Sequence, residues 1–186
     1  MSQRTRSRRD DRAEVILDAA GAVLLRGGAR GLTIDAVAAE AGLSKGGVLH
    51  HYGSKDALIL ALVARKLADL RAGIAACEAE QPPGPSGLAM GMIAHLRRSY
   101  CEDDDFTRAL LLASAENPEA LAGYRAFVAE RLERFDAARG APGVGAALFF
   151  AILGVVMGRT LGFHNLDASE IEPLLSALER AARDLD

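Results

Sequence analysis

Residues 44–55 combine side chains whose types and spacing suit contact with a polyanion. They read SKGGVLHHYGSK and hold two of the three lysines and two of the four histidines of the 186-residue chain. Lysine, histidine and tyrosine can donate hydrogen bonds to phosphates, and adjacent glycines leave backbone N–H groups open to a ligand. The stretch therefore indicates a surface that approaches a negatively charged partner closely.

Two short helices are predicted to position this stretch, over residues 33–41 and 44–52. Thr33 and Ser44 are the predicted N-caps, because a hydroxyl before an apolar helical pattern accepts a bond from an unpaired N–H. Gly42 supplies the tight turn between the helices. This arrangement is typical of a helix-turn-helix, whose second helix enters the major groove of DNA by its N-terminal end.

The polar groups of the motif are expected either to contact DNA or to stabilise the helices that present these contacts. Lys45 projects from the first turn, where it can reach guanine or a phosphate, and Gly46 and Gly47 let the helix end come close. Asp35, in the first turn of the preceding helix, is favoured there by the helix dipole. Three further residues are predicted phosphate donors: His50, Tyr52 and Lys55.

A flexible basic arm is predicted over residues 1–9, before a first helix that covers residues 10–26 and that Gly27 and Gly28 are expected to end. It is placed to lie along the DNA backbone or in the minor groove, and its arginines are Arg4, Arg6, Arg8 and Arg9. Residues 1–66 hold eleven Lys and Arg against seven Asp and Glu, whereas residues 67–186 hold eleven against eighteen. A basic first third agrees with one end meeting a polyanion, although chance fluctuation produces the same asymmetry.

The whole chain is helical in pattern, and about nine helices are expected without a convincing strand. Half of the residues are apolar, and Ala, Leu, Glu and Arg dominate. The Pro/Gly-rich segment 81–87 separates a DNA-binding domain (10–53), extended by a connecting helix (54–79), from a second helical domain (80–186). The longest apolar run, 144–158, is shorter than the roughly 18–20 residues that a membrane span needs. The pattern predicts an all-α cytoplasmic protein that does not enter a membrane.

Enzyme chemistry has little support in the sequence. We find no nucleophile motif, metal cluster, P-loop or dinucleotide-binding glycine pattern, so no cofactor and no catalytic residue are predicted. His50 and His51 point about 100° apart on a helix, and Cys77 and Cys101 are too far apart in sequence for a metal-ligand pair. A helical enzyme stays as a remote alternative to a DNA-binding protein.

Residues 10–60 resemble the DNA-binding domain of TetR-family transcriptional regulators. The stretch TIDAVAAEAGLSKGGVLHHYGSKDAL follows that family's pattern at most positions. Leu49 is a departure, because many relatives carry a tyrosine there that contacts DNA. The resemblance implies a homodimeric repressor that a small-molecule effector releases from a palindromic operator. The alternative is a TetR-like DNA binder that acts as an activator or as a protein-regulated factor without an effector.

Two sets of residues in the second domain are candidates for the functions that the resemblance implies. An effector pocket, suited to a largely apolar or aromatic molecule, is expected to draw on Met92, His95, Tyr100, Phe106, Tyr124 and Phe127. Small residues predict a nearly flat face on helix 144–164: Ala147, Ala151, Gly154, Gly158 and Gly162. That face is either a dimer interface or a site of close packing inside one subunit, and the resemblance favours the interface.

Overall fold

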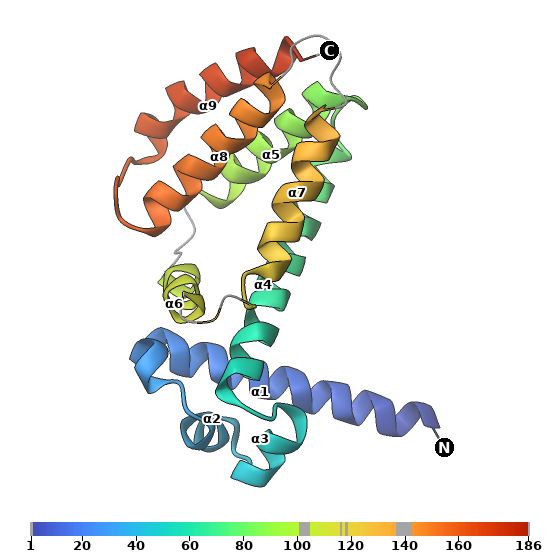
Figure 1. The fold of residues 1–186 in the computed structure, drawn as a ribbon, viewed down its shortest axis with the longest axis vertical. Helices are drawn as coiled ribbons and strands as arrows, with labels where there is room; N and C mark the ends of the chain where they lie inside the picture. The colour runs from blue at the N-terminus through green and yellow to red at the C-terminus, as the bar shows by residue number, and fades with distance from the viewer. Residues whose placement is uncertain (1, 101–104, 116, 118, 137–142, 186) are drawn as a thin grey trace. The chain divides into compact units, whose positions relative to one another are not determined.

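The computed structural model describes residues 2–100, 105–115, 117, 119–136 and 143–185, and every regular element within them is an α-helix (Figure 1). This confirms the predicted all-α class. The helices are α1 (Ser2–Gly31), α2 (Ile34–Ala41), α3 (Lys45–His51), α4 (Lys55–Glu78), α5 (Pro85–Ser99), α6 (Asp105–Ser114), α7 (Ala122–Asp136), α8 (Val144–Thr160) and α9 (Ala168–Arg183).

The helices belong to two units, the first containing residues 1–66 and 105–123 and the second residues 67–104 and 124–186. Helix α4 contributes residues to both units. The position of α6 differs from the sequence prediction, which put residues 105–114 in the second domain, because α6 packs against α1 in the first unit. The two helices are in close contact there, since a Cβ atom at Gly21 would lie 3.4 Å from the ring of Phe106.

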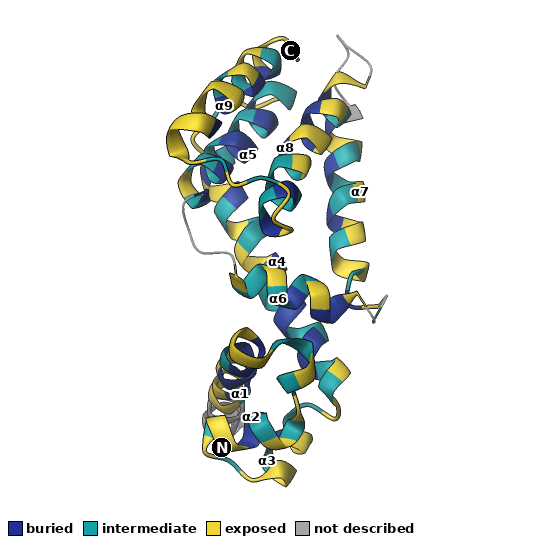
Figure 2. Ribbon diagram, turned by 90° about the vertical axis from the view of Figure 1, so that its left-hand side faces the viewer, coloured by how far each residue is buried: buried dark blue, intermediate teal, exposed yellow. Residues whose placement is uncertain are grey.

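Buried residues of α1 to α4, coloured dark blue in Figure 2, form the core of the first unit. Ile16 and Leu24 of α1, Val37 of α2, Val48 of α3 and Leu62 of α4 are all completely buried. Full burial of one such side chain contributes roughly 1.5–3 kcal/mol. The short helices α2 and α3 are therefore held by tertiary packing as well as by their caps.

Helix α1 is longer at both ends than the sequence predicted. It begins at Ser2, so the residues expected to form an extended arm are helical in the structure, apart from Met1, which lies outside the described residues. Gly28 was expected to help end the helix; it kinks the chain with a φ of 59°, and helical structure resumes as far as Gly31. Glycine adopts a positive φ without the Cβ clash that other residues suffer.

The start of α9 corrects another prediction. The capping-box spacing of Ser169 and Glu172 predicts Ser169 as the N-cap. In the structure Asp167 is the N-cap, and its carboxylate accepts hydrogen bonds from the N–H groups of Ser169 (2.7 Å) and Glu170 (2.9 Å). Glu170 completes the box by accepting from the Asp167 N–H at 2.9 Å. The helix therefore starts earlier than predicted, and Pro173 falls inside it.

The second unit packs α5 against both α8 and α9 around a buried apolar cluster. Ile93 of α5 and Leu175 of α9 are completely buried there, and Phe149 of α8 is nearly so. Arg97 of α5 adds charged contacts to α9, with hydrogen bonds to two of its glutamates. Among the helices that the structure describes, none has both the length and the hydropathy required to span a membrane.

Candidate nucleic-acid interface

Helices α2 and α3 form the predicted helix-turn-helix, with both predicted caps in place. The hydroxyl of Thr33 accepts a hydrogen bond from the N–H of Ala36, and the hydroxyl of Ser44 accepts one from the N–H of Gly47, each at 3.1 Å. Gly42 ends α2 with a φ of 65°. These local bonds define where each helix starts and stops, and so set the angle at which α3 leaves the turn.

The two glycines at the start of α3 have different surroundings. A Cβ atom at Gly46 would meet nothing within 4 Å, whereas one at Gly47 would lie 3.3 Å from the Oγ atom of Ser44. Gly47 therefore accommodates the N-cap. Packing inside the chain does not require glycine at position 46. The lack of a side chain there leaves the exposed N-terminal end of α3 open to close approach by a partner.

Lys45 does not stand alone at this helix end. Its ammonium Nζ lies 2.9 Å from the Oδ2 atom of Asp35, and the side chains are 59% and 70% exposed. The ion pair joins the first turn of α3 to the first turn of α2. The sequence predicts only a helix-dipole role for Asp35, because the contact between the two turns depends on the angle between the helices.

The middle of α3 presents Leu49 and His50 outward. Leu49 is 40% exposed and the His50 side chain is also exposed, whereas His51 is partly buried. The two imidazole rings meet edge to face, with centroids 5.5 Å apart and an interplanar angle of 85°. One histidine thus faces solvent while its neighbour turns inward, as the 100° step of a helix requires.

Tyr52 and Lys55, both predicted phosphate donors, also make contacts inside the first unit. The Tyr52 hydroxyl donates to the Ala13 carbonyl at 3.5 Å, and burial, followed by the negative charge of Glu14, raises the pKa of this phenol. The Lys55 ammonium donates to the Ala29 carbonyl at 2.5 Å. Both side chains therefore tie the segment after α3 to α1, and Lys55 retains two further N–H donors.

One ion pair joins the helix-turn-helix to α1, and a second joins α4 to α1. Arg26 of α1 pairs with Glu40 near the end of α2, and this hydrogen bond lowers the pKa of the Glu40 carboxyl. Arg65 of α4 pairs with Asp18 of α1 at 2.7 Å. These contacts supplement the apolar core in orienting α2 and α3. The four arginines of the predicted basic arm lie in α1, but their side chains fall outside the described part of the chain.

The predicted effector residues divide between the two units. Met92, Tyr100 and Phe127 belong to the buried cluster of the second unit, and Tyr124 packs against it. Tyr100 also donates its hydroxyl proton to the Leu166 carbonyl at 3.0 Å. His95 fits against Gly73, where a Cβ atom would be 2.4 Å from its ring, whereas Phe106 lies in the first unit with α6. Phe106 therefore belongs to a different unit from the other five residues.

Two arginines beside Phe127, of which Arg131 is buried, are not predicted from the sequence. The guanidinium groups of Arg71 and Arg131 lie over this ring, 5.1 Å and 5.2 Å from its centroid. Arg131 pairs with Glu78, and the two side chains are only 4% and 14% exposed. A charged residue on an otherwise apolar helix face is the signal in the sequence for a buried ion pair. Nothing in the sequence indicates which helix supplies the oppositely charged partner.

The five predicted interface residues do not share one open face. In this subunit Ala147, Ala151 and Gly154 are exposed, whereas a Cβ atom at Gly158 would lie 2.8 Å from the ring of His164. Gly162 follows the helix in a left-handed conformation, with a φ of 77°. Gly158 is thus part of the internal packing of this subunit, and the exposed face of small residues on α8 is shorter than predicted.

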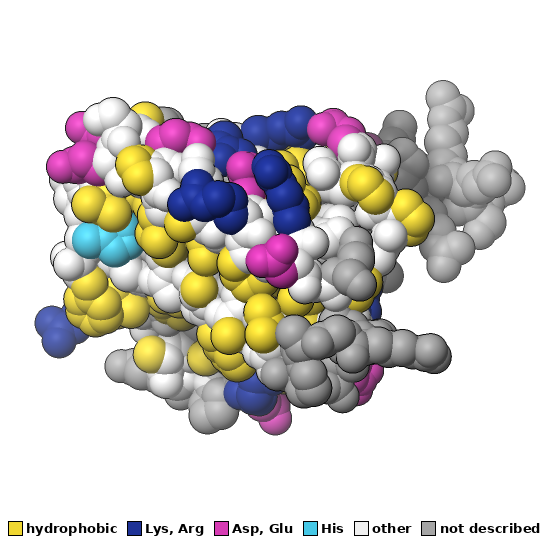
Figure 3. Space-filling view, turned by 90° about the horizontal axis from the view of Figure 1, so that it is seen from above, with side chains coloured by type: hydrophobic (Ala, Val, Ile, Leu, Met, Phe, Trp, Pro, Cys, Tyr) yellow, Lys and Arg dark blue, Asp and Glu magenta, His cyan; other side chains and the backbone are white. Residues whose placement is uncertain are grey.

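Large apolar side chains extend this open surface beyond the small residues. Phe150 of α8 is 51% exposed, and Phe163, in the loop after that helix, is 81% exposed. Figure 3 shows other apolar side chains gathered on one face of the molecule beside clustered basic and acidic groups. Exposed aromatic rings are typical of interaction surfaces, so this part of α8 and its loop is a candidate contact surface.

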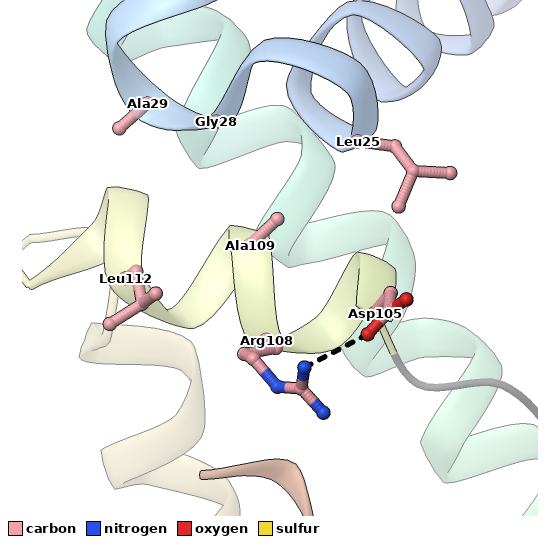
Figure 4. A pocket seen from close by; sticks show the side chains of 7 residues that line it. All are labelled: Leu25, Gly28, Ala29, Asp105, Arg108, Ala109 and Leu112. Atoms are coloured by element: carbon pink, nitrogen blue, oxygen red, sulfur yellow. Dashed lines mark ion pairs between the residues drawn. The ribbon is translucent and has the colours of Figure 1, made fainter. Parts of the chain in front are cut away.

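A shallow pocket lies in the first unit between the end of α1 and α6 (Figure 4). Its volume is about 260 Å³, and its lining residues are Leu25, Gly28, Ala29, Asp105, Arg108, Ala109 and Leu112. Arg108 and Asp105 form a 3.0 Å ion pair at its edge. None of the predicted effector residues lines it.

Two family models match the chain. The model for bacterial regulatory proteins of the TetR family matches residues 16–62, which include α2 and α3, and the model for the tetracyclin repressor-like C-terminal domain matches residues 91–183. The second match alone covers half of the 186 residues. No curated protein matches the chain.

Solved structures share the fold of this chain. A TetR-family member from Streptomyces coelicolor A3 is 24% identical with a TM-score of 0.69, over 90% of this chain and 97% of its own. The multidrug binding protein EbrR in complex with ethidium is 27% identical with a TM-score of 0.66, again over 90% and 97%. With the helix-turn-helix and both family models in agreement, the chain belongs to the TetR family of transcriptional regulators.

Proposed function

We propose that this regulator binds a palindromic operator as a homodimer, represses transcription there, and is released by a small-molecule effector. The observation that carries the proposal is the exposed N-terminal end of α3, where Lys45 stands beside a glycine with open space around it. Such a helix end can enter the major groove and bring N–H groups to the DNA. The protein acts by binding rather than catalysis, in the cytoplasm.

The DNA contacts follow from the exposed side chains of α3. Lys45 donates to guanine O6 or N7, and Leu49 contacts a thymine methyl group where a tyrosine would have reached a phosphate. His50, together with the remaining donors of Lys55, contacts the backbone. Tyr52 contributes chiefly by orienting α3 through its bond to Ala13. The arginines near the N-terminus add salt-dependent affinity for any sequence.

Dimerisation supplies the two recognition helices that a palindrome needs. The exposed apolar surface of α8 and the following loop, which includes Ala151, Gly154 and Phe163, supports an interface there. A two-fold axis through this surface would relate two copies of α3. Their separation in the DNA-bound dimer should be about 34–36 Å or somewhat more, since successive major-groove half-sites lie one turn apart.

The effector is proposed to be largely apolar or aromatic and to bind in the second unit. EbrR binds ethidium and malachite green, and the buried Met92, Tyr100 and Phe127 offer apolar contacts of the same kind. His95 and Tyr124 complete the proposed set. Helix α4 is continuous from Lys55 to Glu78, so a displacement of its second half can reach the residues that support α3. Coupling of this kind is typically about 1–3 kcal/mol and acts equally in both directions.

Selection from random-sequence duplexes tests the DNA-binding proposal. The purified protein should enrich a palindromic sequence, protect both half-sites in a footprint, and lose affinity steeply as salt rises. A footprint without two-fold symmetry, or binding that ignores salt, contradicts it. The enriched duplex then serves to test release: a compound that raises the melting temperature should bind more weakly when the operator is present. Equal affinities identify that compound as a bystander, and tighter binding with the operator contradicts release by that compound.

A further inference from the structure

The ion pair between Asp35 and Lys45 joins the N-terminal turn of α2 to the N-terminal turn of α3. Each residue is in the first turn of its helix, and the charged atoms are 2.9 Å apart with both side chains largely exposed. The Asp35 backbone is fixed by its helix, whose cap is the Thr33 hydroxyl. The carboxylate is therefore a fixed anchor for the longer and more flexible lysine side chain.

Two general effects make a carboxylate unexpected at this place. A negative charge on a DNA-facing surface repels phosphates and lowers affinity for every sequence. An ion pair as exposed as this one adds little to folding stability, because water solvates both charges in the unfolded chain. The main effect of Asp35 is therefore on the direction in which the Lys45 ammonium points.

We infer that Asp35 is a positioning residue that makes Lys45 a reader of bases rather than a binder of phosphates. The inference rests on the proposed function, since it concerns the same DNA surface. An unpaired lysine has a flexible stem and three donors, and it would swing to the nearest phosphates on any duplex. Held by Asp35, it keeps two donors, and the pair carries no net charge.

A neutral pair gains little from the phosphate backbone but can still make directional hydrogen bonds. Guanine presents two acceptors, O6 and N7, in the major groove, and the two remaining donors of Lys45 match that number. Asp35 thereby reduces non-specific affinity and increases discrimination at the base that Lys45 contacts. It also orders the lysine before binding, which reduces the conformational entropy lost in the complex.

The test compares base preferences in a selection from random-sequence duplexes. Lys45→Met should flatten the preference at one position of each half-site. Asp35→Asn, which removes the charge and keeps the size, should reduce the preference at that same position by about two- to fivefold, the range expected for an exposed ion pair. It should also raise affinity for a scrambled duplex. Asp35→Glu should restore most of the preference because the carboxylate returns.

The double variant Asp35→Asn/Lys45→Met separates positioning from direct contact. If Asp35 acts through Lys45, the double variant has the same base preferences as Lys45→Met alone. Asp56 provides a matched control, because it is an exposed acid in the first turn of α4 in the same unit. Asp56→Asn should raise non-specific affinity through its lost charge and leave the base preferences unchanged.

Each outcome decides between the inference and its competitors. Unchanged preferences in a folded Asp35→Asn protein overturn the inference, with the fold checked by thermal unfolding. An effect of Asp35→Asn that persists in the Lys45→Met background also overturns it, because Asp35 would then contact a base itself. A wild-type protein that enriches no sequence refutes the proposed function instead, and the inference with it.

Discussion

The two units of this protein use the same chemical contact, a cation beside a carboxylate, in opposite ways. In the first unit, the Lys45 and Asp35 side chains are 59% and 70% exposed. In the second, the Arg131 and Glu78 side chains are 4% and 14% exposed, beside the ring of Phe127. The exposed pair is open to solvent and to any partner at this surface, whereas the buried pair is committed to the core.

Burial accounts for the difference. Water solvates exposed charges nearly as well as a partner does, so a surface pair contributes only about 0–1 kcal/mol and breaks readily. A buried charge that loses its partner has no such replacement. The Nε atom of Arg131 is already buried without a hydrogen-bond partner among the described residues, so Glu78 is important to its solvation. The exposed pair is thus expected to add little to stability, whereas loss of one partner of the buried pair is expected to be costly.

Removal of the buried carboxylate should have the largest effect. Glu78→Gln leaves the Arg131 guanidinium buried without its counter-ion, and removal of one partner of such a pair costs about 3–5 kcal/mol. The free energy of unfolding, measured by chemical denaturation, should fall by that amount. The control is Glu80→Gln, whose carboxylate pairs with Arg98 in the open, with both side chains more than half exposed. Similar losses in the two variants would contradict the comparison.

Glycines of α8 extend the comparison from charges to packing. Gly158→Ala places a methyl group against the His164 ring, 2.8 Å away, and overpacking of this kind costs about 1–3 kcal/mol of unfolding free energy. Gly154→Leu meets open space within the subunit, so the fold should survive while dimerisation weakens. Denaturation measures the first variant and sedimentation the second. An intact dimer of folded Gly154→Leu protein would show that Gly154 lies outside the interface.

Two lysines sharpen the contrast within the first unit. Lys45→Ala should cost about 1–3 kcal/mol of binding free energy at the selected operator and relax base preference, with little change in stability. Lys55→Ala removes the hydrogen bond to the Ala29 carbonyl, so it should lower stability by about 1 kcal/mol and weaken binding to all sequences alike. Binding titrations on operator and scrambled duplexes distinguish them. Identical specificity profiles would show that the two lysines share one role.

The smallest expected effect concerns an exposed charge that serves a helix end. Hydrogen bonds from the Ser169 hydroxyl and then from the Glu170 and Ser169 backbone N–H groups lower the pKa of Asp167. Its contribution to stability is complete above the ordinary aspartate pKa of about 3.9 and is lost as pH falls through the lower folded value. Melting temperatures of wild type and Asp167→Asn should therefore converge below about pH 4. A constant difference down to pH 2 would be inconsistent with this role.

Local features were predictable from the sequence because the interactions behind them are local. Thr33 and Ser44 were predicted as caps and are caps, and Gly42 ends α2 as expected. Each is settled within about one helical turn by backbone geometry and one hydrogen bond. Where two candidates lie close together, the pattern fails: Asp167 displaced Ser169 as the N-cap of α9 because its carboxylate reaches two N–H groups.

The sequence by itself determined the helical class, the helix-turn-helix and the family of this protein, since apolar periodicity, caps and glycines act over short distances. Only the tertiary structure decided which distant residues meet. It placed Phe106 and α6 with the first unit, and it paired Arg131 with Glu78, 53 residues away. It also covered Gly158 and left Gly154 open on the same helix. These outcomes depend on how helices pack, and many packings are compatible with one amphipathic pattern.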